Sequence, residues 1–201
     1  EYARLIVRMG VNVQKGQDVV IYADLDQPEF VAMVGEEAYK AKAREVTVEW
    51  NYPALTKYHV RYQSLKTLST VEDWQIEKRK HQVETLPCRI HLISDDPDGL
   101  KGINMAKMAK ARQNRYPILK PFSDQMENRQ QWCIAAVPGL AWAKKVVPGV
   151  RGSQAVEKLW EAILSTSRVN GDAVQAWKDH DRDLMDRCAY LNNLGIASLH
   201  Y

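Results

Sequence analysis

Short apolar runs alternate with longer amphipathic segments along this chain of 201 residues. An alternation of this kind predicts βα units arranged around a mainly parallel sheet. Four of the runs are strand-like, because they are short and either follow turn signals or alternate in polarity. They cover residues 18–23, 45–50, 88–94 and 132–137. We therefore expect a single α/β domain whose sheet is flanked by helices.

Helical periodicity follows several of these runs. After Pro28, apolar side chains recur at helical spacing, and proline suits a first turn because its missing N–H leaves no hydrogen bond unmade there. This pattern predicts a helix over residues 28–43, and a second helix is expected over residues 71–86. A third is expected over residues 103–115, ending before Pro117 because proline disfavours the helical conformation in the residue that precedes it.

The clearest helix is expected over residues 172–194. Its apolar side chains are spaced three and four residues apart, which places them on one helical face. They are Val174, Trp177, Leu184, Cys188 and Leu191. Asp172 is suited to cap the first turn and Gly195 to end the last one. The strand-like residues 195–201 then predict the start of a strand that leads into a further domain.

The charge balance of the chain is close to even. Lysine and arginine number 28 and aspartate and glutamate 25, which gives a formal net charge of +3. This bias is too weak to indicate a nucleic-acid partner, for which a clustered basic face is expected. No apolar run approaches the roughly 20 residues that cross a bilayer, so we expect no membrane partner.

The N-terminal residues and the cysteines bear on the cellular compartment. Residues 1–20 lack the apolar core of a signal peptide, which favours a cytoplasmic location. Cys88, Cys133 and Cys188 are odd in number and show no CxxC spacing. We therefore expect reduced structural thiols rather than disulfides or zinc ligands.

The loop after the first expected strand carries two carboxylates, Asp24 and Asp26, and no glycine. A dinucleotide site needs glycines at this turn so that a pyrophosphate can approach the helix N-terminus. Carboxylates would repel a phosphate, so nucleotide binding is not expected here. Asp95, Asp96 and Asp98 follow the third expected strand, where ligands of α/β proteins bind, although aspartate, proline and glycine also form a simple turn at such places.

Charged residues cluster over residues 179–183 in the last expected helix. No metal-binding motif surrounds them, and a solvent-exposed helical face explains most of the cluster. Asp181 differs because it falls in the apolar seam between Trp177 and Leu184, where a carboxylate is costly unless it is paired or turned toward an interface. We expect Trp177, His180 and Asp181 to make an interdomain or helix-anchoring contact.

Residues 100–123 form a basic stretch without one acidic side chain. Its charges are Lys101, Lys107, Lys110, Arg112, Arg115 and Lys120. On a helix, Lys107 and Lys110 point away from the two arginines, so the charge is dispersed and a solvated helix is the simpler explanation. The alternative is a stand-alone α/β binding module for a small anionic ligand, in which neutralising Lys107 or Lys110 would abolish binding.

Three stretches in the second half of the chain carry a family resemblance. They are WCIAAVPGLAWAKKVVPG (132–149), AVEKLWEAIL (155–164) and AWKDHDRDLMDRCAYLNNLGIASLHY (176–201). Their order and wording resemble the N-terminal half of the thermophilic metalloaminopeptidases of the aminopeptidase S, aminopeptidase T and PepS type. Gly139 and Val147 depart from the family pattern, in which a threonine and an aromatic residue are common at these places.

The resemblance implies a hydrolase that releases N-terminal amino acids from peptides by means of a metal-activated water. It also implies a homodimer. The family's metal ligands, a set of Glu, His, Tyr and Asp residues, belong to a second half beyond residue 201. The implied cofactor of the full-length enzyme is a divalent metal pair of zinc, cobalt or manganese. No residue present here is carried over as a metal ligand or catalytic base, so no metal is expected on this chain alone.

We therefore expect residues 1–194 to form the N-terminal α/β domain of such an aminopeptidase. Its partners would be its own C-terminal catalytic domain, a second copy of the chain and peptide substrates. The domain would shape the wall of the active-site cavity and contribute to assembly. Without the second half, we expect it to be inactive.

Overall fold

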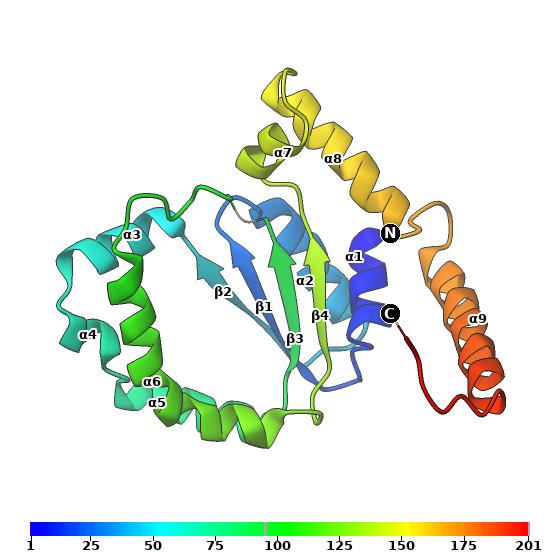
Figure 1. Ribbon diagram of the computed structural model, residues 1–201, viewed down its shortest axis with the longest axis horizontal. Helices are drawn as coiled ribbons and strands as arrows, with labels where there is room; N and C mark the ends of the chain where they lie inside the picture. Colours follow the sequence, from blue (N-terminus) through cyan, green and yellow to red (C-terminus); the bar gives the residue numbers. More distant parts are fainter. Residues whose placement is uncertain (95, 201) are drawn as a thin grey trace.

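The computed structural model describes residues 1–94 and 96–200 and confirms the expected fold class. Its centre is a four-stranded sheet in the order β2-β1-β3-β4, with every neighbouring pair parallel (Figure 1). The strands are β1 (Asp18–Asp24), β2 (Glu45–Asn51), β3 (Cys88–Ile93) and β4 (Trp132–Ala136). Each end lies within one residue of its expected position.

Helices connect the strands and lie around the sheet (Figure 1). They are α1 (Tyr2–Leu5), the π-helical η1 (Ile6–Gly10), α2 (Pro28–Lys40), α3 (Pro53–Tyr62), α4 (Leu65–Ser69), α5 (Asp73–Thr85), α6 (Met105–Met126), α7 (Leu140–Val146), α8 (Gly152–Thr166) and α9 (Ala173–Asn193). The helices expected over residues 28–43, 71–86 and 172–194 are α2, α5 and α9, with ends that differ by no more than three residues. In the described part of the chain, no helix combines the length and the apolar character needed to cross a membrane.

One face of the sheet carries the core. Val19 and Ile21 of β1 point to this face, and Ile90 of β3 lies beside Ile21 in the parallel register. All three side chains are fully buried. Buried residues of η1, α2 and α8 pack with them in one cluster. The burial follows from the strand period of two, which sends alternate side chains of every strand to the same face.

The opposite face of the sheet is covered unevenly. On it Tyr22 of β1 and His91 of β3 stack with their ring centroids 4.7 Å apart. Burial, with the nearby Arg89 guanidinium, lowers the pKa of His91. Residues of α5 and α6 lie over β1 and β2 on this side. On β4, by contrast, Trp132 and Ile134 remain 64% and 61% exposed.

Helix α6 corrects the expectation that Pro117 ends the third helix. The helix continues through Pro117 and Pro121 to Met126. Each proline removes one backbone hydrogen bond, but both are exposed, so water can solvate the freed carbonyls. Ala111 and Met126 are buried near opposite ends of the helix, and their packing holds the helical path across the prolines. Figure 1 shows that α6 changes direction between its two ends.

Helix α9 has the expected ends but not the expected burial. The Asp172 carboxylate accepts a hydrogen bond from the Gln175 N–H at 3.3 Å, and Gly195 adopts a left-handed conformation with φ +60°. Ala173 is buried, whereas residues 181–200 are exposed throughout. The apolar side chains of Leu184, Cys188 and Leu191 therefore lie on a surface that no described residue covers.

The strand expected over residues 195–201 is not formed by residues 196–200, which have no regular secondary structure. Residue 201 lies outside the described residues. A strand is stabilised by hydrogen bonds to a neighbouring strand, and the described residues offer this segment none. The expectation of a further domain after residue 194 stays a prediction.

Candidate functional site

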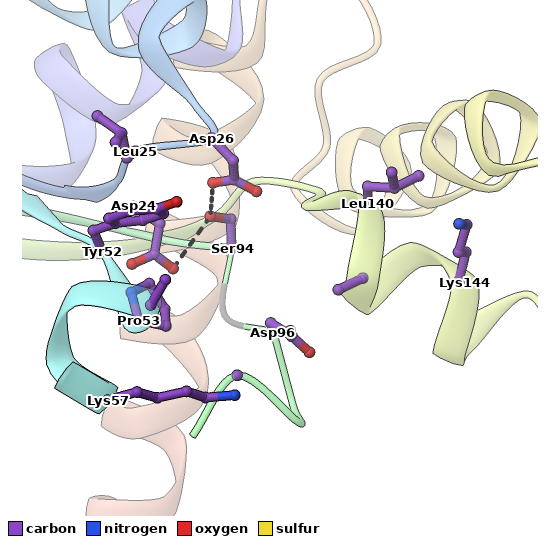
Figure 2. Close-up of a pocket in the computed structure, with 13 residues that line it drawn as sticks. Asp24, Leu25, Asp26, Tyr52, Pro53, Lys57, Ser94, Asp96, Leu140 and Lys144 are labelled. Carbon is purple, nitrogen blue, oxygen red and sulfur yellow. Dashed lines mark hydrogen bonds between the residues drawn. The ribbon is translucent and has the colours of Figure 1, made fainter. Parts of the chain in front are cut away.

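A cavity of about 700 Å³ opens at the carboxyl ends of β1 and β3 (Figure 2). From β1 the chain passes through α2 to β2 on one side, and it then crosses back to β3 on the other side. Neighbouring strands whose connections diverge in this way leave a crevice in which open α/β sheets bind ligands. The cavity is walled by the loops after both strands and by the first turns of α3 and α7.

A pair of carboxylates forms one wall of this cavity. The Ser94 hydroxyl donates to Asp26 Oδ1 at 2.8 Å and lies 3.5 Å from Asp24 Oδ2. Asn51 Nδ2 donates to Asp24 Oδ1 at 2.5 Å. Asp24 and Ser94 are only 8% and 3% exposed, whereas Asp26 is exposed. Figure 2 shows Ser94 between the two carboxylates, which are therefore held in place by the last residue of β2 and the residue that follows β3.

The start of α7 approaches this pair closely. A Cβ atom on Gly139 would lie 2.5 Å from the Ser94 carbonyl oxygen and 2.9 Å from Asp26 Oδ2. Gln27 Nε2 donates to the Pro138 carbonyl at 3.3 Å, which ties the loop after β1 to the loop after β4. Ser94 and Asp26 thus occupy the space that a side chain at position 139 would need.

Two lysines stand on the remaining walls. Lys57 projects from α3 and Lys144 from α7, and neither forms an ion pair with another described residue. Lys145, next to Lys144, instead pairs with Asp98 at 3.2 Å. Apolar side chains complete the lining, among them Leu25, Tyr52, Pro53 and Leu140. The Lys144 side chain runs toward Gly152 at the start of α8, with its Cε 3.1 Å from the place that a Cβ of Gly152 would take.

The described aspartates after β3 form a turn, and one of them also lines the cavity, which are the two roles that the sequence left open. The Asp98 N–H donates to Asp96 Oδ1 at 2.9 Å and the Gly99 N–H to the Asp96 carbonyl, so these residues form a turn. Asp96 also lines the cavity. Asp95 lies outside the described residues.

Metal binding does not fit the described part of this chain. No group of three or more His, Cys, Asp or Glu side chains among residues 1–94 and 96–200 is placed to hold a metal ion. The charged cluster over residues 179–183 lies on the surface of α9, where Arg182 pairs with Asp179 at 2.9 Å. The three cysteines are free, with Cys88 buried and Cys188 exposed. Burial raises the pKa of the Cys88 thiol to about 11, which keeps it protonated at neutral pH.

The residues expected at an interdomain contact lie away from the cavity. Trp177 and His180 meet edge to face with ring centroids 5.7 Å apart, and Trp177 Nε1 donates to the Ser167 carbonyl at 2.8 Å. Trp177 therefore anchors the start of α9. Asp181 is exposed on the same helix. Their interdomain role stays a prediction.

The basic stretch over residues 100–123 is spread over several structural contacts. Lys107 Nζ donates to the carbonyls of Val60 and Gln63 at 2.7 and 2.5 Å, which caps the end of α3. Lys110 bonds to Gln113 at 3.1 Å. The charge is dispersed, as the helical pattern predicts. A second cavity, of about 650 Å³, is nevertheless lined by cationic side chains of α3, α6 and the loop between β3 and α6. They are Lys57, Arg61, Lys101 and Lys107.

Sequence reasoning noted Asp24 and Asp26 only as groups that exclude a phosphate, whereas it placed Asp96 at a strand end where ligands of α/β proteins bind. It missed Asn51, Ser94, Lys57 and Lys144 altogether. The usable signal was the position of Asn51 and Ser94 at the ends of two strands, since the carboxyl ends of parallel strands meet at one edge of the sheet. The two lysines carry no such signal, because their place at the cavity depends on how α3 and α7 pack.

Comparisons with known proteins agree with the fold. The family described as "Thermophilic metalloprotease (M29)" matches residues 1–201. Aminopeptidase AmpS of Bacillus subtilis (strain 168) is 33% identical over 202 residues, and aminopeptidase PepS of Streptococcus thermophilus is 30% identical over 204 residues. Both alignments cover 100% of this chain and 49% of the relative.

A solved structure gives the same result. Wild-type AmpT from Thermus thermophilus superposes with a TM-score of 0.85 and 29% sequence identity, over 98% of this chain and 49% of that one. The chain thus spans about half the length of the relatives that it matches. Because the family match covers the whole chain, the chain belongs to the thermophilic metalloprotease (M29) family.

Proposed function

We propose that this chain is the N-terminal half of a metal-dependent aminopeptidase that releases N-terminal amino acids from peptides. The observation that carries the proposal is the extent of the match, which takes in all of this chain and 49% of relatives named as aminopeptidases. In this proposal the domain walls one side of the active-site cavity and contributes to assembly. Alone it does not hydrolyse peptides.

A divalent metal pair, of zinc, cobalt or manganese, belongs to the other half in this proposal. The family description names a metalloprotease. The described residues of this chain do not fit such a pair, because no group of three or more His, Cys, Asp or Glu side chains among them is placed to hold a metal ion. No step of the reaction is therefore assigned to a metal on this half.

Helix α9 is the proposed contact with the catalytic half. Its last three turns and the segment that follows carry large apolar side chains on an exposed surface. They are Leu184, Met185, Tyr190, Leu191, Leu194, Ile196 and Leu199. Exposed apolar side chains that gather in one segment are typical of an interface. Trp177, His180 and Asp181 would lie at its start, where α9 leaves the body of the domain.

We also propose that the full-length enzyme is a cytoplasmic homodimer that acts on peptides. A cytoplasmic location is supported by three free cysteines, which suit a reducing compartment. The exposed apolar residues of β4, Trp132 and Ile134, are a candidate surface for a second copy. Sedimentation of a full-length form should give twice the monomer mass, and a Trp132→Ser variant that sediments unchanged would remove β4 from the dimer contact.

The test of the main proposal compares two forms of the protein. The 201-residue chain and a longer form that continues beyond residue 201 are assayed on leucine p-nitroanilide with zinc, cobalt or manganese added. We expect turnover by the longer form alone. Turnover by the 201-residue chain would contradict the proposal, because it would place a complete site among the residues present.

A second candidate function is that of a binding module for a small anionic ligand. It is favoured by the second cavity, which gathers Lys57, Arg61, Lys101 and Lys107. Lys110 is not among the residues that line it, and Lys107 already caps α3. Arg61→Gln and Lys101→Gln are therefore the informative variants. Saturable binding of inorganic phosphate that both variants weaken would support this function, and binding unaffected by either would contradict it.

A further inference from the structure

We propose that Asn170 is a deamidation site, at which the chain converts into an aspartate form and an isoaspartate form without the help of an enzyme. The reactive pair is Asn170 and Gly171, in the loop between α8 and α9. The modification itself rests on this loop alone. Any effect on a contact between α9 and a catalytic half rests on the proposed function.

The reaction needs only the chain and water. The backbone nitrogen of Gly171 attacks the side-chain carbonyl carbon of Asn170, and the side-chain amide leaves as ammonia with the proton of the Gly171 N–H, so that a succinimide ring forms. Water then adds to one of the two ring carbonyls and a ring C–N bond breaks. Opening at the side-chain carbonyl gives aspartate. Opening at the main-chain carbonyl gives isoaspartate, in which the main chain continues through the side chain.

The fold leaves the attacking nitrogen available. Asn170 and Gly171 are both exposed. No described residue accepts a hydrogen bond from the Gly171 N–H or bonds to the Asn170 side-chain amide. A backbone N–H that is held in a hydrogen bond would have to break that bond before its nitrogen could attack. At Gly171 no bond of this kind to a described residue has to be broken.

Glycine also removes the steric obstacle to ring closure. It has no Cβ, so no side chain shields the attacking nitrogen and the backbone reaches conformations closed to other residues. Gly171 has a φ of +92°, and nothing lies within 4 Å of the place that a Cβ would take. The loop therefore has room for the succinimide ring.

A second dipeptide of the same reactive type is blocked by the fold. Asp98 and Gly99 can form the same ring with loss of water. Gly99 is buried, however, and its N–H donates to the Asp96 carbonyl at 2.9 Å. The Asp98 carboxylate pairs with Lys145 at 3.2 Å. The two dipeptides carry similar sequence signals, and the structure leaves one open and holds the other.

The products change the approach to α9. Asp172 caps the first turn of this helix through the Gln175 N–H at 3.3 Å. A carboxylate at position 170 adds negative charge near the helix N-terminus, which the helix dipole favours. Isoaspartate also lengthens the main chain by one carbon atom ahead of the cap. The bond from Trp177 Nε1 to the Ser167 carbonyl lies across this loop, so α9 stays attached while the path of the loop changes.

The test incubates the 201-residue chain at pH 8.5 and follows the tryptic peptide of residues 169–178 by mass spectrometry. Deamidation appears as the mass difference between –OH and –NH2. Asn193 is the matched comparison, because it is exposed but is followed by Leu194, whose N–H donates to the Leu191 carbonyl at 3.2 Å. We expect Asn170 to deamidate about tenfold or more faster than Asn193, which corresponds to a barrier difference of about 1.4 kcal/mol or more. An unchanged peptide, or equal rates at the two asparagines, would overturn the proposal.

A parallel incubation in guanidinium chloride separates the effect of the fold from that of the sequence. Asn170 should react at a similar rate in the folded and the unfolded chain. Asp98 should isomerise in the unfolded chain alone, which gives a new chromatographic peak of unchanged mass. Protection of Asn170 in the folded chain would mean that the loop holds it, and this result would overturn the inference.

Variants assign the mass change to one residue. Asn170→Ser should remove it from the peptide of residues 169–178, and Asn193→Ser should leave it unchanged there. A mass change that persists in Asn170→Ser would overturn the assignment. The readout does not depend on peptidase activity. Deamidation without turnover by the longer form would leave the modification site standing and contradict the aminopeptidase proposal, whereas turnover without deamidation would do the opposite.

Discussion

The hydroxyl of Ser94 should be the most sensitive single group in the first cavity. It is 3% exposed and donates to the Asp26 carboxylate at 2.8 Å. A hydrogen bond to a charged group contributes about 1.5 to 3 kcal/mol to stability. Ser94→Ala removes this bond without adding volume, so no steric strain complicates the result.

Two features of the site set the expected magnitude. Asp24 keeps its 2.5 Å bond from Asn51, so it is not left without a donor. Asp26 is exposed, so water can replace the lost hydroxyl in part. Both features place the loss at or below the lower end of that range. We expect Ser94→Ala to lower the free energy of unfolding by about 1 to 2 kcal/mol.

Urea denaturation followed by far-UV circular dichroism measures this change. Ser123→Ala is the matched control, because its exposed hydroxyl makes only a 3.5 Å contact with the Leu119 carbonyl and its loss should cost less than about 0.5 kcal/mol. The slope of the denaturation curve should stay unchanged in both variants. If Ser94→Ala were as stable as the control, Ser94 would not be bonded to the carboxylates, and the conclusion that Ser94 holds Asp24 and Asp26 in place would be wrong.

Three further predictions concern burial. Ile90→Ala should lower the free energy of unfolding of the 201-residue chain by about 2 to 5 kcal/mol, because Ile90 is fully buried. Leu191→Ala, on the exposed face of α9, should change the free energy of unfolding by less than about 0.5 kcal/mol. Equal losses in urea denaturation would mean that the face of α9 is packed. Iodoacetamide at pH 8 should modify Cys188 and spare Cys88, whose thiol has a pKa of about 11, and mass spectrometry showing fast Cys88 labelling in the native protein would contradict its burial. The lowered pKa of His91 means that the unfolded chain binds a proton at this histidine more readily than the folded chain does. The contribution of His91 to the free energy of unfolding is therefore present above about pH 6.5 and is lost as the pH falls below that value. His91→Gln should flatten the fall in the free energy of unfolding between pH 7.5 and 5, and an unchanged slope would contradict this.

The strands could be predicted from sequence because their signal is local. The strand over residues 18–23 is an apolar run bounded by a turn, and the structure differs from it by one residue. The end predicted for the helix over residues 103–115 was wrong for the opposite reason. The cost of Pro117 is local, but the buried contacts of Ala111 and Met126 that outweigh it come from the tertiary fold.

The candidate site shows the same limit more sharply. Asp24 and Asn51 bond to each other because they are partners in the parallel register of β1 and β2, and Ser94 reaches Asp26 because β3 lies on the other side of β1. None of these contacts follows from spacing along the chain. They follow from the strand order β2-β1-β3-β4, which the periodicity of single segments does not determine.

Helix α9 is where the sequence pattern and the packing disagree. Its apolar spacing is that of a helix with a buried face, yet Leu184 and Leu191 are exposed in the 201-residue chain. Most helical stability in proteins comes from packing of the apolar face against other parts of the fold. An exposed apolar face of this kind is what an interface would require. The comparison with relatives about twice as long points in the same direction by a separate route, since it uses chain length and not surface chemistry. The exposed apolar face and the length of the relatives together support the proposal that α9 docks on a catalytic half, and each can be tested without the other. Substitution of Leu191 in a longer form would test whether the apolar face of α9 is a contact, and peptidase turnover by the longer form would test whether a catalytic half follows.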